Sequence, residues 1–344
     1  MGHMALVVDR RGAALEAGTH QTVVVKHADG RRERVGLRAL GSVVLHGDVQ
    51  LSTGLLQSLA SHGVALAVLP LRGSTQAVGF TQLPHRQATL RHCQHLAYAC
   101  SSQRLELARL VVQAKFEGAA AFAAEREPSL PDGYGLALRS ALAAPDVATL
   151  MGVEGVHAVR HFERLERAYA AGGPFTFSGR SRRPPEDAPN ALMSLSYTLA
   201  QAQAAQLALH AGLDVQLGFL HGLQRDRQSL ALDLLEAARA PIDGWVLQLL
   251  ARQRLIQPKH FGDSPDGPIR LNQEGRSIFY PLWFSQGHLV AMRPMRRLLA
   301  RLVNALRSSA TTAAHALAGE AQQSERSQSA VEPAKAPEVG CLPR

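Results

Sequence analysis

The spacing of apolar and polar positions predicts strands over roughly the first 80 residues. Short β-branched or alternating stretches are separated by turn signals such as Asp29-Gly30, which is typical of strands joined by tight turns. These stretches are ALVVD (5–9), QTVVVKHA (21–28), RRERVGLRAL (31–40), SVVLHG (42–47) and VALAVLPLRG (64–73). STGLLQSLASHG (52–63) has the leucine spacing of a short helix, with Ser or Thr as its cap and Gly63 at its end. Residues 4–78 therefore predict a small β domain that carries one helix.

Beyond residue 86 the apolar spacing becomes that of helices. Helical runs are predicted at 86–125 (with a break near Ser101-Ser102), 136–144, 146–151, 154–171, 188–211, 229–238, 243–254 and 289–307. The segment at 79–86 reads as a linker between the two patterns. The predicted fold class is α+β, a small N-terminal β domain followed by a larger all-α domain at 87–307.

The two ends of the chain follow neither pattern. Residues 1–3, which precede Met4, look like a cloning scar. Residues 308–344 are rich in Ala, Ser, Gln and Pro and carry few large apolar side chains. Such a segment buries too little surface to offset its ordering entropy, so we expect this low-complexity tail to be largely disordered. Its Ala-rich part is also compatible with an extension of the last helix.

Composition narrows the class of protein. A chain of 344 residues exceeds one ordinary core and so favours two domains. No apolar run is long enough to span a bilayer and no secretory leader is present, so we expect a cytoplasmic protein. The formal charge of +9 favours a polyanionic partner, although acidic substrates or solubility also explain it. Three cysteines make no disulfide framework.

A first candidate for chemistry is Glu154, which lies between Gly152 and Gly155 at the start of a predicted helix. Its immediate neighbours are small or apolar. Such a carboxylate is compatible with a helix N-terminal cap stabilised by the helix dipole, or with a functional acid.

A second candidate is the stretch HGLQRDRQSLALDLLEAAR, residues 221–239. Asp233 and Glu236 are three residues apart on a predicted helix and so project near one another. Mg²⁺ and Mn²⁺ prefer carboxylate oxygens, and Mn²⁺ readily accepts an imidazole such as that of His221. Spacing alone leaves open both a metal site and an ordinary surface helix.

Arginines supply the third signal. Arg182 and Arg183 precede a rigid Pro184-Pro185 turn and a long helix, where forked donors can grip phosphate. Arg293, Arg297 and Arg301 recur every four residues and form a stripe on one helical face. The stripe is compatible with a phosphate backbone or with simple solubility.

Taken together, these segments resemble the CRISPR-associated integrase of spacer acquisition, the first of the core Cas protein families. The resemblance covers roughly residues 5–300. It rests on GVEGVHAVRHFE, RRPPEDAPNALMSLSYTL and GFLHGLQRDRQSLALDLLEAAR, which occur in this order and at family-like separations. The resemblance implies a β domain that dimerises, joined to an α-helical catalytic domain.

The resemblance also implies roles for individual residues. Glu154, His221 and Glu236 match the family's metal ligands for Mg²⁺ or Mn²⁺, and Asp233 matches an acid that assists them. The implied structural supports are Asn190, Ser194 and Tyr197. Candidate DNA contacts are Arg182, Arg183, Arg225, Arg227, Arg239, Arg293, Arg297 and Arg301. Implied partners are DNA fragments, the CRISPR repeat, a second copy of the chain, and a small second Cas protein that bridges two dimers.

The implied activity is metal-dependent transesterification, in which the 3′-hydroxyl of a captured DNA fragment attacks a phosphodiester of the CRISPR repeat. Two other classes stay open from the residues alone. The chain could be a non-catalytic DNA-binding scaffold of a nucleoprotein complex. It could also be a helical enzyme that uses aspartate-rich Mg²⁺ sites for diphosphates, but only one D-x-x-E pair is present and the β domain is then unexplained.

Overall fold

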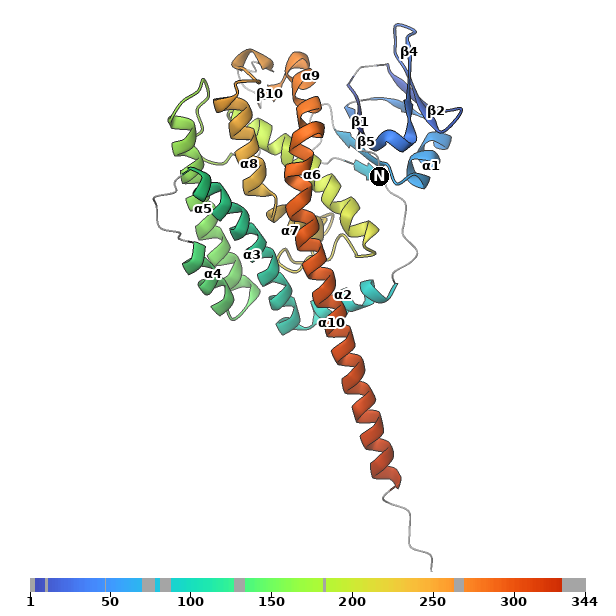
Figure 1. Cartoon of the computed structure of the whole chain (residues 1–344), viewed down its shortest axis with the longest axis vertical. Coiled ribbons are helices and arrows are strands. Elements are labelled where there is room, and N and C mark those ends of the chain that lie inside the picture. Colours follow the sequence, from blue (N-terminus) through green and yellow to red (C-terminus); the bar gives the residue numbers. More distant parts are fainter. Residues whose placement is uncertain are drawn as a thin grey trace, which may run out of the picture.

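The structure is a computed structural model that describes residues 4–9, 12–46, 48–69, 78–80, 88–126, 134–181, 184–262 and 269–329. Only the backbone is described at 5, 69, 78–80 and 309–329. A strand-rich unit sits beside the upper part of a helical body, and one long helix extends from that body (Figure 1). A strand-rich region followed by a mostly helical domain is the α+β fold class that the sequence predicts.

The N-terminal unit contains two four-stranded sheets. The strands are β1 (Met4–Val8), β2 (Ala14–Gly18), β3 (Thr22–Lys26), β4 (Arg32–Gly36), β5 (Leu40–His46), β6 (Gln50–Leu51), β7 (Ala65–Leu69) and β8 (Val78–Phe80). One sheet has the order β1-β5-β7-β8, with β1, β5 and β7 parallel, and the other has the order β4-β3-β2-β6. Leu15, Val23, Val43 and Leu55 lie at or near zero exposure in the core of this unit.

Most of the strand predictions are confirmed, and the turn chemistry explains the register. Gly30 has φ +84°, and its N–H donates to the carbonyl oxygen of His27, which turns β3 into β4. The helix α1 (Thr53–Ser61) begins where the Ser52 hydroxyl accepts from the Leu55 N–H. Gly63, at φ +65°, ends it. Strands β2, β6 and β8 were not predicted, and β8 includes residues 79–80 of the predicted linker.

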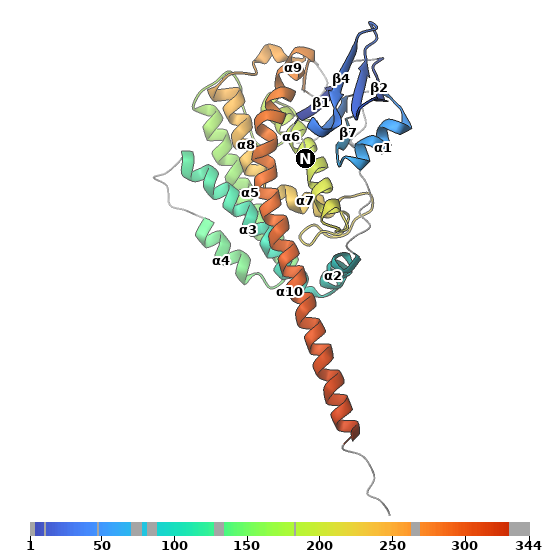
Figure 2. The same cartoon turned by 45° about the vertical axis from the view of Figure 1, so that its right-hand side comes forward.

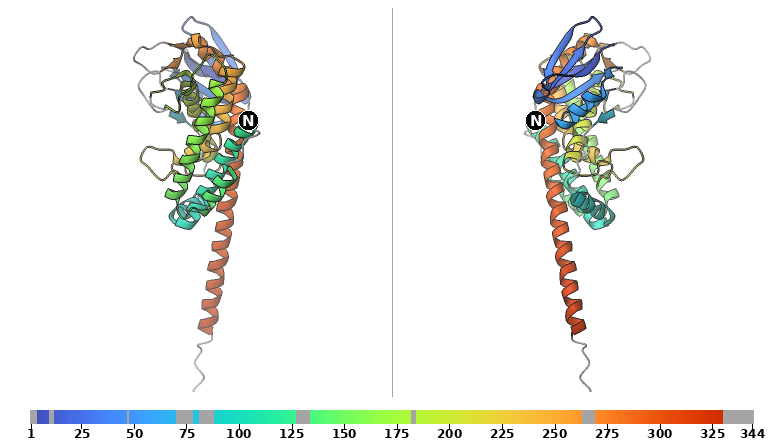
Figure 3. Two further views of the ribbon diagram at one scale, coloured as in Figure 1. Left: turned by 90° about the vertical axis from the view of Figure 1, so that its left-hand side faces the viewer. Right: turned by 90° about the vertical axis from the view of Figure 1, so that its right-hand side faces the viewer.

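The helical body begins at residue 88. Its helices are α2 (Ala88–Ala99), α3 (Ser101–Arg126), α4 (Tyr134–Ala143), α5 (Val147–Ala170), α6 (Ala188–His210), α7 (Ser229–Glu236), α8 (Arg239–Leu247), α9 (Gln273–Leu282) and α10 (His288–Ser329). A short hairpin, β9 (Phe261–Gly262) with β10 (Arg270–Leu271), precedes α9. Helix α3 packs against α4, α5, α8 and α10, and α6 packs against α7, α8 and α10. Figures 2 and 3 show that α3, α5 and α8 lie along one side of α10.

Helix α5 corrects one prediction. The runs 146–151 and 154–171 form a single helix, which begins where the Asp146 carboxylate accepts from the Thr149 N–H at 2.7 Å. Burial of Leu150 and Leu165 against the core outweighs the cost of about 1 kcal/mol for each interior glycine. Glu154 therefore lies two turns inside α5, and its interpretation as an N-terminal cap is wrong.

Other boundaries moved by a few residues. The run predicted at 243–254 corresponds to α8, which starts at Arg239, and to a wider helical turn at Gln248–Arg252. Helix α10 continues past 307 to Ser329, through the Ala-rich part of the tail. Residues 1–3, 81–87 and 330–344, on which the predicted scar, most of the linker and the end of the tail fall, lie outside the described residues.

Contacts between the two units hold the β domain against the helices. Arg276 on α9 donates to the Asp9 carboxylate at 2.6 Å, directly after β1. Helix α6 also contacts β7. Among the residues that the structure describes, no helix combines the length and the apolar character of a membrane span.

Candidate active site

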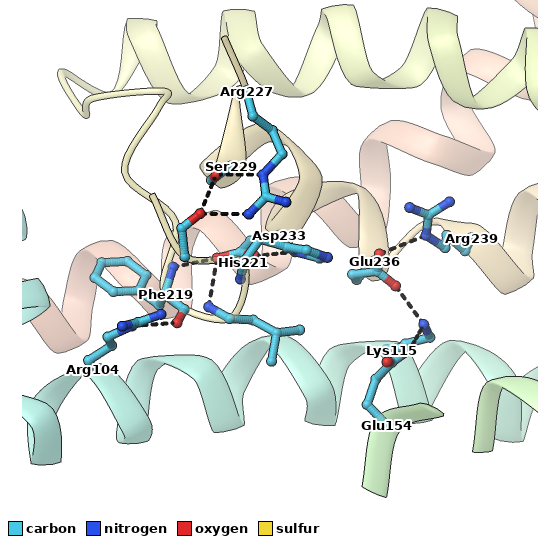
Figure 4. A network of polar contacts seen from close by, with 12 residues as sticks. Arg104, Lys115, Glu154, Phe219, His221, Arg227, Ser229, Asp233, Glu236 and Arg239 are labelled. Atoms are coloured by element: carbon cyan, nitrogen blue, oxygen red, sulfur yellow. Dashed lines mark hydrogen bonds and ion pairs between the residues drawn. The ribbon is translucent and has the colours of Figure 1, made fainter. Parts of the chain in front are cut away.

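Three separate segments bring the predicted acids and the histidine together. Glu154 comes from α5, Glu236 from the last turn of α7, and His221 from the loop between α6 and α7 (Figure 4). Helix α3 runs along the other side and supplies Lys115. The candidate site is therefore assembled by tertiary packing of helices that are distant in sequence.

Asp233 holds the His221 loop in place. This fully buried carboxylate accepts the backbone N–H groups of Phe219 at 2.6 Å, Leu220 at 3.1 Å and His221 at 2.9 Å. Its Oδ1 also lies 2.7 Å from Nδ1 of the His221 ring. Because a carboxylate only accepts, Nδ1 carries the proton, and the lone pair of the neutral ring is on Nε2. Figure 4 shows the ring reaching away from Asp233 toward Glu236.

Asp233 and Glu236 therefore do not share one target, although they are one helical turn apart. Asp233 points into the loop, whereas Glu236 points to the opposite side, where basic groups flank it. This arrangement gives Asp233 an orienting role and leaves Glu236 at the site.

Lys115 lies between the two glutamates. Its ammonium donates to Oε1 of Glu154 and, at 2.6 Å, to Oε2 of Glu236. The remaining oxygen of Glu236 accepts from Arg239 Nε at 2.7 Å. All four side chains are shielded from water, with exposed fractions between 5% and 19%.

The charges of this cluster reinforce one another. Burial acts to raise the pKa of Glu236, but Arg239 and Lys115 outweigh burial and hold that pKa well below its usual value. Burial likewise acts to lower the pKa of Lys115, yet Glu236 and Glu154 raise it above its ordinary value. Glu236 is thus an anion and Lys115 a cation at neutral pH.

The donor types suit a hard divalent cation. Two carboxylates and an imidazole nitrogen are ligands that Mn²⁺ and, less readily, Mg²⁺ accept, and a carboxylate behind a ligating histidine is a common orienting partner. Within the described residues, no three His, Cys, Asp or Glu side chains converge closely enough to hold a metal. The Lys115 ammonium stands where a cation would contact both glutamates. The ligand atoms are therefore of the kinds that bind a divalent metal, and the Lys115 ammonium takes the place of that cation in this structure.

The predicted supporting residues form a network beside the cluster. The Asn190 side-chain oxygen accepts from Arg180 at 2.8 Å, and the Ser194 hydroxyl accepts from the same guanidinium at 2.9 Å. Asp187 caps α6 by accepting the Asn190 N–H at 2.6 Å. The guanidinium of Arg180 lies 5.5 Å from the ring centre of Tyr197.

Tyr197 connects this network to the cluster. The guanidinium of Arg239 also lies over the Tyr197 ring, 4.8 Å from its centre. The Tyr197 hydroxyl donates a hydrogen bond to Asp243. Asp243 also lies 2.9 Å from Nε2 of the buried His161. Burial, with the Asp243 charge beside it, raises the pKa of Tyr197 well above its usual value, so Tyr197 is a hydrogen-bond donor and not a phenolate.

The predicted DNA-binding arginines have different surroundings. Arg182 and Arg183 lie outside the described residues. Arg225 is exposed, whereas Arg227 donates to the Gly222 carbonyl at 2.6 Å and so braces the His221 loop. Arg293 and Arg297 are exposed on α10, and Arg301 pairs with Glu117 on α3 at 3.1 Å. Of the predicted arginines that the structure describes, Arg239 alone reaches the carboxylate cluster.

Two basic features were missed by the sequence analysis. One is Lys115, which reads as an ordinary helix lysine. The other is a cavity of about 460 Å³ between the ends of α3, α5 and α8. The arginines that line it are Arg126, Arg164, Arg167, Arg252 and Arg254. Spacing gives no signal for either, because the residues come from different helices.

Comparisons with known proteins identify the family of this chain. Residues 6–284 match the family model described as CRISPR associated protein Cas1. A CRISPR-associated endonuclease from Thermus thermophilus is 34% identical over 278 residues, which cover 79% of this chain and 83% of that protein. The chain belongs to the Cas1 family.

Solved structures support the Cas1 fold. A Cas1 protein from Thermotoga maritima superposes with a TM-score of 0.77 at 23% identity, over 89% of this chain and 97% of that one. A casposase bound to an integration product gives 0.68 at 20% identity, over 89% and 82%. A chain of a Cas6-RT-Cas1–Cas2 complex gives 0.69 at 18% identity, over 89% and 35%.

The family match contains the whole candidate site. Glu154, His221 and Glu236 all lie within residues 6–284, as does Lys115. Helix α10, which begins at His288, lies beyond it. The resemblance inferred from the sequence motifs is therefore confirmed at the level of the family.

Proposed function

We propose that this Cas1 protein is a metal-dependent DNA endonuclease and integrase of CRISPR adaptation, which joins the 3′-hydroxyl ends of captured DNA to the CRISPR repeat. One observation carries the proposal: Glu154 and Glu236, from two helices distant in sequence, share the cation Lys115, and the charge of Glu236 is also sensed by His221. The names of the curated relatives, which are CRISPR-associated endonucleases, support a nuclease or integrase of CRISPR adaptation.

The reaction is a transesterification. The 3′-oxygen of the captured fragment attacks a phosphorus of the repeat, a new P–O bond forms, and the bond to the repeat's own 3′-oxygen breaks. Because one P–O bond forms and one breaks, the number of phosphodiesters is unchanged. The attacking hydroxyl loses a proton and the leaving 3′-oxygen gains one. A bound Mg²⁺ or Mn²⁺ supplies Lewis-acid charge to the phosphate oxygens.

The chain's own residues prepare this chemistry. Glu154, Glu236 and Nε2 of His221 would hold the cation. Asp233 fixes the tautomer and direction of the imidazole, and Arg239 keeps Glu236 ionised and oriented. The arginine-lined cavity is a candidate seat for the DNA backbone, since guanidinium groups bind phosphate with paired donors.

The position of the cavity fits a single DNA strand that passes the site. Lys115 and Arg126 lie on the same helix, eleven residues apart, which corresponds to roughly 16 Å at 1.5 Å per residue. A smaller cavity between them is lined by Ala119 and His161, among others. We therefore propose that the strand runs from the Lys115 site toward the arginine-lined cavity.

We further propose that the protein acts in the prokaryotic cytoplasm as a homodimer. The small second Cas protein would bridge two such dimers, and a Cas1–Cas2 complex among the structural relatives supports that partner. The exposed Arg225, Arg293 and Arg297 are candidate contacts for DNA in the assembled complex.

The test is a half-site integration assay with Mn²⁺ or Mg²⁺, with and without the second Cas protein. Glu154→Gln, Glu236→Gln and His221→Gln are expected to abolish strand joining while retaining DNA binding. Glu163→Gln, the same change at an exposed position of α5, is the control and is expected to keep it. Normal joining by any of the three variants contradicts the proposal. Salt-sensitive DNA binding without joining by the wild type would favour a scaffold.

A further inference from the structure

Lys115 occupies the centre of the candidate metal site. We propose that its ammonium is a resident counter-cation, which leaves the two glutamates when a divalent cation binds and then pairs with a phosphate of the DNA. Metal and DNA would thereby bind cooperatively. The inference rests on the proposed function and concerns how the same site is switched on.

The first argument is charge balance. Glu154 and Glu236 contribute two negative charges, and Lys115 and Arg239 contribute two positive ones, so the cluster is neutral as it stands. A divalent cation added to this set would create an excess of two positive charges in surroundings that screen poorly. Release of the Lys115 ammonium removes one of them.

The second argument is the use of individual atoms. Oε1 of Glu236 is taken by Arg239, and Oε2 is taken by Lys115 at 2.6 Å. Oε1 of Glu154 is taken by the same ammonium. A metal about 2.0–2.1 Å from an oxygen of each glutamate would lie in the space between them that the ammonium fills, so the ammonium and the metal compete for the same position.

The third argument is where the released charge can go. A buried ammonium without a partner is costly, so Lys115 needs a new anion. Asp243 lines the adjoining small cavity, but its oxygens already accept from Tyr197 and lie against His161. Glu117, also on α3, is paired with Arg301. An incoming DNA phosphate is then the anion that completes the exchange.

The experiment measures Mn²⁺ affinity by electron paramagnetic resonance, with and without a DNA fragment that ends in a 3′-dideoxynucleotide and so is not joined. In the wild type, DNA is expected to tighten Mn²⁺ binding about tenfold, within the usual range of coupling between sites. Lys115→Gln is expected to bind Mn²⁺ about tenfold more tightly without DNA. DNA should then add little in this variant.

Two further variants keep the result interpretable. Lys259→Gln is the matched control, because it removes the same charge from an exposed lysine paired with Glu274, and it should behave as the wild type. Lys115→Arg keeps the charge and should retain weak metal binding without DNA. In EDTA, the Lys115→Gln protein should melt at a lower temperature than the wild type, because its two glutamates repel each other without a cation between them. Addition of Mn²⁺ should restore the melting temperature.

The outcomes separate this inference from the proposed function. If the wild type binds Mn²⁺ through Glu236 and joins DNA, but Lys115→Gln has unchanged Mn²⁺ affinity and unchanged coupling, the exchange is refuted and the integrase stands. If neither protein binds Mn²⁺ with or without DNA, both ideas are refuted. Weaker Mn²⁺ binding by Lys115→Gln also overturns the exchange, since it would make Lys115 a support for the metal and not its competitor.

Discussion

Replacement of Asp233 by asparagine tests the geometry of the His221 loop without any assumption about activity. The carboxylate accepts four hydrogen bonds, with Oδ2 serving Phe219 and Leu220, and Oδ1 serving the His221 backbone and ring. An amide has the same shape but only one acceptor oxygen. Because the site is fully buried, water does not replace what is lost.

The amide orientation with the smallest loss keeps its oxygen at the Oδ2 position. Its NH₂ group then faces the His221 N–H, which is left without an acceptor, and faces the ring nitrogen, which has to accept. One unpaired buried donor costs about 1–3 kcal/mol, and hydrogen bonds to a charged acceptor are worth more than those to a neutral one. We expect Asp233→Asn to lose about 2–4 kcal/mol of unfolding free energy. The corresponding fall in Tm is about 4–16 °C for a domain of this size.

The same substitution changes the tautomer of His221. If Nδ1 accepts from the amide, the proton moves to Nε2, and the lone pair that faces the site is lost. Urea unfolding measures the stability, and ¹⁵N chemical shifts of the imidazole report the tautomer. Asp146→Asn is the control, because this exposed cap accepts one N–H and asparagine caps equally well, so its stability should change by less than about 0.5 kcal/mol.

Two results would refute the reasoning about Asp233. One is an Asp233→Asn protein as stable as the Asp146→Asn control, since the four hydrogen bonds would then contribute nothing. The other is an unchanged Nδ1–H tautomer in a folded variant, which would show that the ring is oriented by something other than Asp233.

Three other predictions concern regions around the site. Burial lowers the pKa of His46 from its usual 6.5, and Arg276 and Arg270 add to this effect, while the nearby Asp9 carboxylate opposes it without reversing it. Folding therefore favours neutral His46, so the unfolding free energy is full above pH 6.5 and falls as the pH drops, by up to about 1.4 kcal/mol per pH unit. His46→Gln should flatten this slope in urea titrations between pH 7 and 5. Arg252→Gln should weaken DNA binding and lower the salt slope by about one, whereas Arg31→Gln in the β hairpin should not, as fluorescence anisotropy at several salt concentrations would show. Asp243→Asn should lower the unfolding free energy by about 2–4 kcal/mol and Tyr197→Phe by about 1–2 kcal/mol, because both oxygens of Asp243 face buried donors. Equal losses in urea unfolding would contradict this.

The fold was predictable where local signals agree with tertiary packing. Strands β3 and β5 are β-branched and bounded by turn residues, so pattern alone finds them. Strand β2, Ala14–Gly18, has only one strongly apolar residue, Leu15, and is a strand because β3 and β6 flank it. Helix α5 shows the converse case, since local glycine signals suggested a break that core burial overrides.

The sequence predicted which acidic residues and which histidine form the candidate site, but not which residues each of them contacts. The i, i+3 spacing of Asp233 and Glu236 correctly places both near the same end of α7, yet it suggests a shared target. Spacing along a helix does not state which neighbour each side chain meets. That depends on the loop folded over one side of α7 and on α3 packed against the other.

Lys115 shows that the residue missed by the sequence pattern is one that the site needs for charge balance. Nothing in QAKFEG distinguishes this lysine from one on a solvated face. Two buried carboxylates that approach one another must acquire cations, or a proton, in the folded state, because an unpaired buried charge costs several kcal/mol. The sequence supplies two acids by pattern and resemblance, and the requirement for neutrality then predicts a basic residue on whichever helix packs against them. Helix α3 meets that requirement with Lys115, so charge balance, applied after the packing is known, finds a residue that pattern does not.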